Sequence, residues 1–197
     1  MVRSPTRQIA ALLSALLAAV GCAGAPRALP EAPAPSPTMR VLARSAVPGV
    51  AAMTTALPVT ELAKDAPISS LPSKLADWGY RGGRERTFQG ESRHLTLVVS
   101  RSLAFDDRAG AAAFTAFVRA NAAAYFGVGV ETRALATQDR SGWEFVPPPC
   151  ACHMANPVEI GVVPDGSAVT WLEINGPDAT KAELVRLLKP GRSVPVP

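Results

Sequence analysis

The sequence is poor in the residues from which most active sites are built. It contains two histidines, three cysteines and two tyrosines in 197 residues. It has no Gly-x-Ser-x-Gly elbow, no His-Glu-x-x-His motif and no glycine-rich phosphate loop, the patterns that fix catalytic groups in space. His94 begins a predicted strand far from any nucleophile, and Cys152 and His153 point apart if they are neighbours on an extended segment. We therefore expect a protein that is not an enzyme.

Long apolar runs are also scarce. The run at residues 9–20 would span about 18 Å as a helix, against roughly 30 Å for a bilayer core. It follows the cations Arg3 and Arg7 and leads into the small residues at 19–21, which is the order of an export signal. No comparable run follows it, so the sequence predicts no membrane-spanning helix.

A cysteine stands directly after the small residues. Residues 19–22, Ala-Val-Gly-Cys, resemble the lipobox of bacterial lipoproteins, although Ala19 stands where leucine is commonest. The resemblance extends over residues 1–22. It implies cleavage before Cys22, lipid on that cysteine, and attachment to the extracytoplasmic face of the cell membrane. The alternative is an ordinary secretory signal with an incidental cysteine.

Charge gives little indication of a polyanionic partner. The net charge of +4 falls to +2 without Arg3 and Arg7, which leaves 18 basic and 16 acidic residues. There is no basic stripe of the kind that nucleic-acid binding needs, so we expect no such partner. Abundant alanine and proline indicate a GC-rich genome, as in actinobacteria. With the lipobox, this composition resembles that of small actinobacterial lipoproteins of unknown function, and the order of predicted elements is similar to the Mog1/PsbP group.

Proline divides the chain into segments. Residues 23–38 hold five prolines and few large apolar side chains, which favours an extended tether. Residues 39–70 contain three more prolines, which would interrupt any long helix and favour partial disorder with one or two short packed pieces. The expected organisation is a signal peptide at 1–21, a lipidated and largely disordered tether at 22–70, one domain at 71–191 and a tail at 192–197.

The predicted domain mixes strands and helices. Residues 94–105 alternate apolar and polar side chains, which predicts a strand. A helix is expected at 108–126 after Asp106 and Asp107, and another opens at the capping box that starts at Thr180. Further strands are expected at 84–89, 131–137, 143–146, 158–162 and 168–175, with a turn at 82–83. We predict an α+β fold: a twisted antiparallel sheet of about five to six strands with two amphipathic helices packed mainly on one face.

One short cluster carries possible chemistry. Cys150, Cys152, His153 and Met154 stand between a proline run and Asn156-Pro157, in a predicted loop. Two thiols, an imidazole and a thioether form a soft ligand set that suits copper(I) best and zinc second. The spacing matches neither a structural zinc site nor a haem attachment motif. A disulfide, a redox-active thiol pair and unpaired or intermolecular cysteines remain alternatives. We expect no other cofactor.

A basic group surrounds the first predicted hairpin. Arg81, Arg84, Arg86 and Arg93 could meet anionic lipid headgroups or wall polymers, but interleaved glutamates favour a solvated hairpin with ion pairs. The three tryptophans, at 78, 143 and 171, could line a ligand groove, although packing in or beside the core is favoured.

These observations predict a lipid-anchored, non-catalytic binding or scaffold module in the cell envelope. Its partner would be an envelope protein, a lipid or a small ligand, in addition to the membrane reached through the lipid. The alternative is a lipoprotein that binds copper or zinc, or acts in thiol redox chemistry, through the cysteine cluster.

Overall fold

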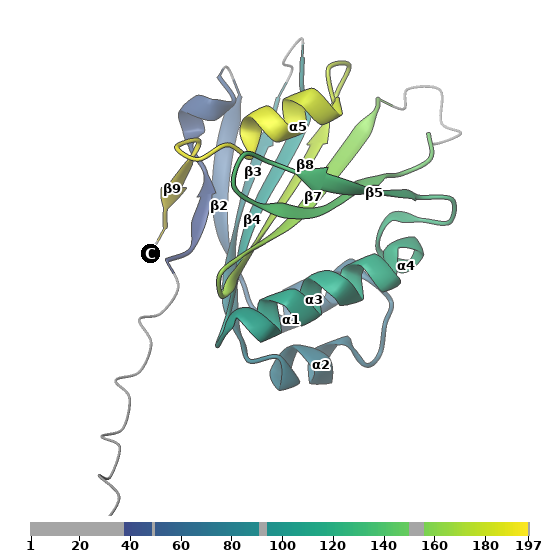
Figure 1. Ribbon diagram of the computed structural model, residues 1–197. Helices are drawn as coiled ribbons and strands as arrows, with labels where there is room; N and C mark the ends of the chain where they lie inside the picture. The colour runs from purple at the N-terminus through teal and green to yellow at the C-terminus, as the bar shows by residue number, and fades with distance from the viewer. Residues whose placement is uncertain (1–37, 49, 91–93, 150–155, 197) are drawn as a thin grey trace, which may run out of the picture. The chain divides into compact units, whose positions relative to one another are not determined.

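The computed structural model of the chain (Figure 1) describes residues 38–48, 50–90, 94–149 and 156–196. These residues lie in one compact unit. It confirms the predicted α+β class, with every strand pair antiparallel. Seven strands form one sheet in the order β2-β3-β4-β8-β7-β6-β5, and β1 pairs with β9 in a second, two-stranded sheet.

In chain order, the described elements are β1 (Arg40–Leu42), η1 (Arg44–Ala46), β2 (Ala51–Leu57), α1 (Val59–Leu62), η2 (Ala63–Asp65), α2 (Leu71–Asp77), β3 (Tyr80–Gln89), β4 (Leu97–Phe105), α3 (Arg108–Ala120), α4 (Ala122–Phe126), β5 (Glu131–Ala136), β6 (Ser141–Val146), β7 (Val158–Asp165), β8 (Ala168–Asn175), α5 (Lys181–Leu187) and β9 (Ser193–Pro195). The strand candidates of the sequence analysis correspond to β3–β8. The expected turn at 82–83 lies inside β3, where the register shifts between Tyr80 and Gly82.

The central strands are buried on both sides, and their side chains alternate between two hydrophobic clusters. In β8, Val169 and Trp171 belong to the cluster under α3, whereas Leu172 and Ile174 belong to the cluster under α5. We call these two sides of the sheet the α3 face and the α5 face. The two helices expected from the sequence therefore cover opposite faces, not mainly one (Figure 1).

The α3 face is covered by four helices. Asp107 caps α3 by accepting a hydrogen bond from the Gly110 backbone N–H at 2.8 Å. The single helix expected at 108–126 is divided at Asn121, whose side chain donates to the carbonyl of Phe117 at 2.9 Å. This side-chain bond competes with the helical ladder, so a short α4 follows after the break.

The folded domain begins before Leu71, the expected boundary. The expected tether contains β1, η1, β2, α1 and η2, and the expected tail contains β9. Pro48 and Pro58 flank β2 instead of interrupting it, because proline is excluded only from positions that donate to the ladder. Within β2 only Leu57 is buried, so this strand shows no alternation of apolar and polar side chains that the sequence could reveal.

Candidate functional site

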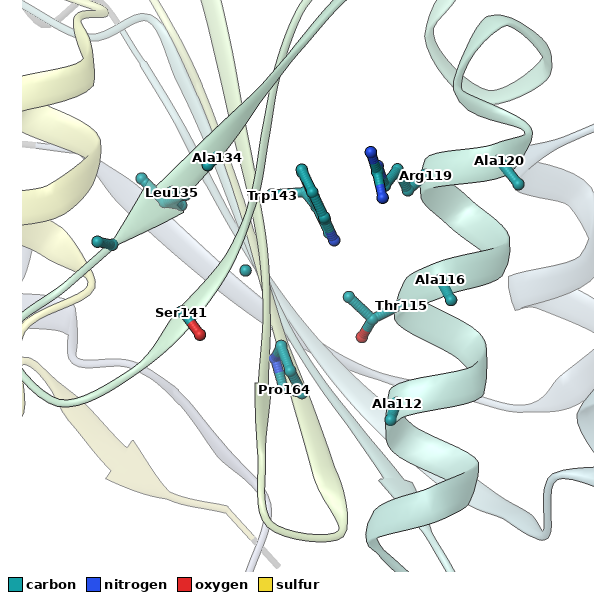
Figure 2. A pocket seen from close by; sticks show the side chains of 12 residues that line it. Ala112, Thr115, Ala116, Arg119, Ala120, Ala134, Leu135, Ser141, Trp143 and Pro164 are labelled. Atoms are coloured by element: carbon teal, nitrogen blue, oxygen red, sulfur yellow. The ribbon is translucent and has the colours of Figure 1, made fainter.

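An open groove of about 800 Å³ lies between α3 and the β5–β6 hairpin (Figure 2). Its helical wall is a row of small side chains on α3, including Ala112, Ala116 and Ala120. Trp143 of β6 forms the opposite wall, and Pro164 of β7 lies at one end. The lining is therefore largely apolar, with room left by the alanines.

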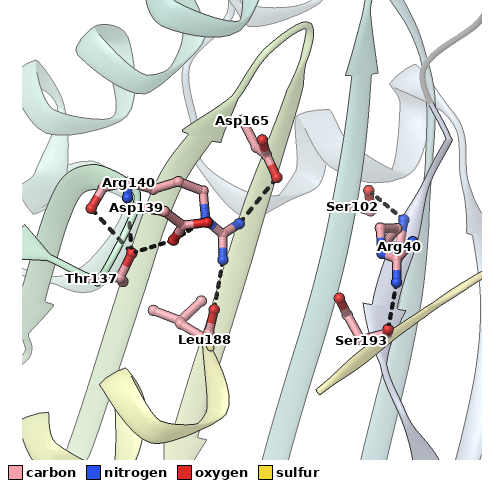
Figure 3. Close-up of polar contacts among 8 residues, drawn as sticks. All are labelled: Arg40, Ser102, Thr137, Asp139, Arg140, Asp165, Leu188 and Ser193. Atoms are coloured by element: carbon pink, nitrogen blue, oxygen red, sulfur yellow. Dashed lines mark hydrogen bonds and ion pairs between the residues drawn. The ribbon is translucent and has the colours of Figure 1, made fainter. Parts of the chain in front are cut away.

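The groove exists because the hairpin curls toward α5 and away from α3. Arg140, at the hairpin turn, donates from Nη2 to the Leu188 carbonyl at 2.6 Å and pairs with Asp165 at 3.2 Å (Figure 3). Lys181 of α5 donates to the carbonyl of Ala134 in β5 at 3.3 Å. These contacts fasten the hairpin to the α5 side and leave its other side open to α3.

Gly142 allows the close approach that shapes the groove floor. A Cβ at this position would lie 2.3 Å from the Val162 carbonyl oxygen, which is a severe clash with the backbone. β6 pairs with β7 only over residues 143–145, so the strand departs from the sheet at this glycine. A substitution at Gly142 would therefore move the wall that carries Trp143.

Arg119 supplies the one charge among the described residues that line the groove. Its guanidinium carbon lies 3.7 Å from the centroid of the Trp143 ring, in cation–π geometry. Among the described residues it has no ion-pair partner. The site thus combines an apolar trough with one cation at its rim.

Two hydroxyl side chains, those of Thr115 and Ser141, line the groove. Thr115, one of its two hydroxyl side chains, donates to the Ala111 carbonyl at 2.9 Å, as expected for a helical threonine. Within the described ranges, no three histidine, cysteine, aspartate or glutamate side chains are grouped so that they could hold a metal ion.

A second polar feature, a half-buried ion network, lies on the α3 face. Arg101 of β4 donates from Nε to Glu85 at 2.6 Å and also pairs with Asp65 of the 3-10 helix. Its guanidinium lies 5.3 Å from the Trp171 ring centroid. Burial raises the pKa of Asp65 against the lowering effect of Arg101, and burial also raises the pKa of Glu173. This network joins η2 to the sheet, so its role is structural.

A third charged group lies on the α5 face. Glu144 of β6 is fully buried and accepts a hydrogen bond from Lys181 at 2.7 Å. Burial and the neighbouring Glu144 together raise the pKa of Glu159 to about 7. The sequence predicted neither this group nor the Arg101 network, because their side chains are distant in sequence and come together only when the strands pair.

The described arginines of the predicted basic group are used within the fold. Arg86 is buried and donates to Thr54 Oγ1 at 2.7 Å and to the Leu42 carbonyl at 2.8 Å. Arg81 pairs with Asp106, and Arg84 reaches the carbonyl of Gly83 at 3.4 Å. Arg86 is therefore unavailable to an anionic surface, since its guanidinium holds β1 and β2 in place.

The other predicted site residues lie outside the described residues: Cys22, Arg93, Cys150, Cys152, His153 and Met154. His94, the first described residue after 91–93, contacts Asp178 with 2.5 Å between Nδ1 and Oδ2. Trp78 and Trp171 pack with other aromatic rings, in agreement with the predicted role in or beside the core. Trp143 is the tryptophan that lines a groove.

Comparisons with known proteins give little more. No protein-family model matches the chain, and no curated protein matches it. Among solved structures, the extracellular domain of PknH from Mycobacterium tuberculosis is similar at 16% sequence identity. The match covers 68% of this chain and 76% of that one, with a TM-score of 0.32. In the part of the chain that the structure describes, no helix has the length and apolar character to cross a membrane.

Proposed function

We propose that this chain is a lipid-anchored, extracytoplasmic binding module that holds a small amphipathic ligand in the groove between α3 and the β5–β6 hairpin. The single observation that carries the proposal is the groove itself. Its volume of about 800 Å³ falls within the 300–1,000 Å³ that is common for small-molecule sites. A spacer with a purely mechanical role has no need of such a groove.

The lining suggests the chemical class of the ligand. Alanines, Trp143 and Pro164 suit an apolar body, whose burial contributes about 25 cal/mol for each Å² removed from water. Arg119 is the charged lining residue, and its guanidinium carbon already lies over the Trp143 ring. A ligand carboxylate or sulfonate would therefore meet a preorganised guanidinium, which binds such groups through two parallel hydrogen bonds.

A groove-filling substitution tests this function. The chain from Ser36 onward is titrated with anilinonaphthalene sulfonate, a fluorescent probe with an apolar body and one negative charge. We expect saturable binding, weakened about tenfold or more by Ala116→Phe because the new ring occupies the trough. Ala123→Phe is the matched control, since Ala123 is exposed on α4 and does not line the groove. Equal binding by both variants would contradict the proposal.

Membrane attachment rests on the lipobox resemblance at residues 19–22 and has its own test. In a bacterial host, the wild-type chain should fractionate with membranes and carry lipid. Cys22→Ala should be released or left unprocessed. Unchanged membrane fractionation of Cys22→Ala would contradict lipid anchoring while leaving ligand binding in the groove untouched.

The soft-ligand cluster supports the alternative function of metal binding or thiol redox chemistry. Its residues lie outside the described part of the chain, so the sequence alone supports it. A binding module should keep its probe affinity in the double variant Cys150→Ser, Cys152→Ser, apart from some loss of stability. A metal or redox protein should instead lose bound copper or zinc, or its reducible thiol pair, in that variant.

A further inference from the structure

The two edges of the large sheet are protected to different degrees. The β5 edge carries Glu131 and Arg133, which form an ion pair, and its hairpin is curled out of the sheet plane. The β2 edge has the sequence Ala-Ala-Met-Thr-Thr-Ala-Leu. It has no charge and no proline, and its register with β3 runs unbroken from Ala51 to Leu57. Charges, prolines and bulges are the usual devices that prevent an edge from pairing, and β2 has none of them.

The β2 edge is also open. Five of its seven residues are exposed, including Met53, which is 64% exposed. No backbone group of Ala51–Ala56 is hydrogen-bonded to another backbone group of the described residues outside the ladder with β3. β1 does not cover this edge, because it lies over β3 and β4, where Leu42 N–H bonds Ser100 Oγ at 2.9 Å. The outward backbone groups of β2 are therefore available to another strand.

We propose that β2 pairs antiparallel with β2 of a second copy of this chain, so that two sheets join into one across a two-fold axis beside Thr54. Full overlap of a seven-residue strand with itself places its central residue, Thr54, opposite the same residue of the partner. A symmetric pair of this kind presents the same patch from both copies. This interface lies on the opposite sheet edge from the ligand groove and does not depend on it.

The side chains of β2 suit self-pairing. In this register Ala52 meets Ala56 on the α5 face, and Met53 meets Thr55 on the α3 face. The Thr54 hydroxyl accepts a hydrogen bond from Arg86 at 2.7 Å, which leaves its own proton free to be donated to the other Thr54. Threonine pairs across strands are favourable, and no like charges oppose each other. Pairing also covers Met53, one of the three large apolar side chains exposed in the described residues.

Cysteine cross-linking in the full chain tests the interface directly. Thr54→Cys places two thiols across the two-fold axis, where Cα atoms of paired strands lie about 4.5–5.5 Å apart, within disulfide reach. We expect mild oxidation of membranes from an expressing host to convert Thr54→Cys into a disulfide-linked dimer. Thr132→Cys, at an exposed position on the β5 edge, is the matched control. The wild-type chain reports any dimer formed through its own cysteines.

A charge at the edge provides the second variant. Adding Met53→Lys to Thr54→Cys should lower the cross-linked fraction about fivefold or more, because each copy would bring an unpaired lysine to the joined edge. The proposal is overturned if Thr54→Cys yields no more dimer than Thr132→Cys, or if Met53→Lys leaves the yield unchanged. A mixed disulfide of Thr54→Cys with a different protein would also overturn self-pairing, in favour of a foreign strand on β2.

Discussion

The two faces of the sheet are built from different side chains and leave different spaces. The α3 face is rich in rings: Tyr80, Phe105, Phe114, Phe145 and Trp171 belong to its buried cluster. The α5 face is mainly aliphatic, with Phe88 as its buried aromatic residue. The alanines of α3 and the curled hairpin leave a groove of about 800 Å³ beside the ring cluster, whereas the hollow beside α5 on the aliphatic face is smaller, about 290 Å³.

Gly161 illustrates how closely the α5 face is packed. A Cβ at this position would lie 3.1 Å from Leu135, 3.2 Å from Leu188 and 3.4 Å from Leu184. One more methyl group here would therefore require these leucine side chains to move by a few tenths of an ångström. The comparison teaches that the β5–β6 hairpin packs closely against α5 on one face and stands away from α3 on the other, where the groove lies.

The largest effect should come from the ring cluster. Phe114→Ala removes a fully buried ring that contacts Trp78 and Phe105, and should lower the free energy of unfolding by about 4 kcal/mol. Leu184→Ala, its counterpart on the α5 face, should cost about 3 kcal/mol. Urea denaturation of both variants measures the difference. A larger loss for Leu184→Ala would contradict the expectation that the ring cluster contributes more to stability than the aliphatic cluster.

The next effect concerns the half-buried ion network on the α3 face. Arg101→Leu should cost about 2 kcal/mol, because Asp65 and Glu85 would be left half-buried without their cation. The loss should shrink as the pH falls, since burial already raises the pKa of Asp65 and protonation removes the unpaired charge. Arg133→Leu is the control at an exposed pair and should cost less than about 0.5 kcal/mol. Equal losses for the two variants would show that the network contributes nothing through burial.

A smaller effect is expected on the α5 face, where Glu159 makes the free energy of unfolding depend on pH. The pKa of Glu159 is raised to about 7, so the folded state holds a proton that the unfolded chain releases near its ordinary pKa of 4.5. Stability from this group is therefore present below about pH 4.5 and is lost as the pH rises toward 7. Glu159→Gln should flatten this dependence on pH. At pH 8 it should raise the free energy of unfolding by about 1 kcal/mol, a modest gain because Glu159 is partly exposed to solvent. Thermal unfolding between pH 4.5 and 8 tests it, and an unchanged slope in the variant would contradict it.

The smallest effect on stability should be at the groove. Arg119→Gln should change the free energy of unfolding by less than about 0.5 kcal/mol, since Arg119 is exposed. The same substitution should weaken binding of anilinonaphthalene sulfonate about fivefold, through loss of one charge-assisted contact. Parallel denaturation and titration measure both quantities. A variant that loses stability but not affinity would make Arg119 a packing residue.

The sequence predicted the elements better than their arrangement. Alternation marked the central strands and the caps at Asp107 and Thr180 marked helix starts, because these are local patterns. The helix at the C-terminal capping box, α5, was expected on the same face of the sheet as α3, but it covers the opposite face. The sequence of an amphipathic helix shows which of its sides is buried, but not which face of the sheet it covers. β2 was missed because an edge strand with one buried residue shows no alternation.

The groove was foreseen less well than the fold. Trp143 was considered for a groove, but packing was favoured, and no local pattern marks the alanines of α3 as part of a groove. Their role depends on the curl of the β5–β6 hairpin, which the Arg140 and Lys181 contacts hold in place. No local pattern encodes contacts between residues so far apart in sequence.

In the proposed function, the apolar body of the ligand lies against Trp143 in the groove. The most direct measurement is quenching of tryptophan emission by a fatty acid brominated at mid-chain, with Trp143→Phe as the comparison. We expect saturable quenching of the wild-type chain that is largely lost in Trp143→Phe, while Trp78 and Trp171 keep their emission. Absent quenching, or equal quenching in the variant, would contradict it.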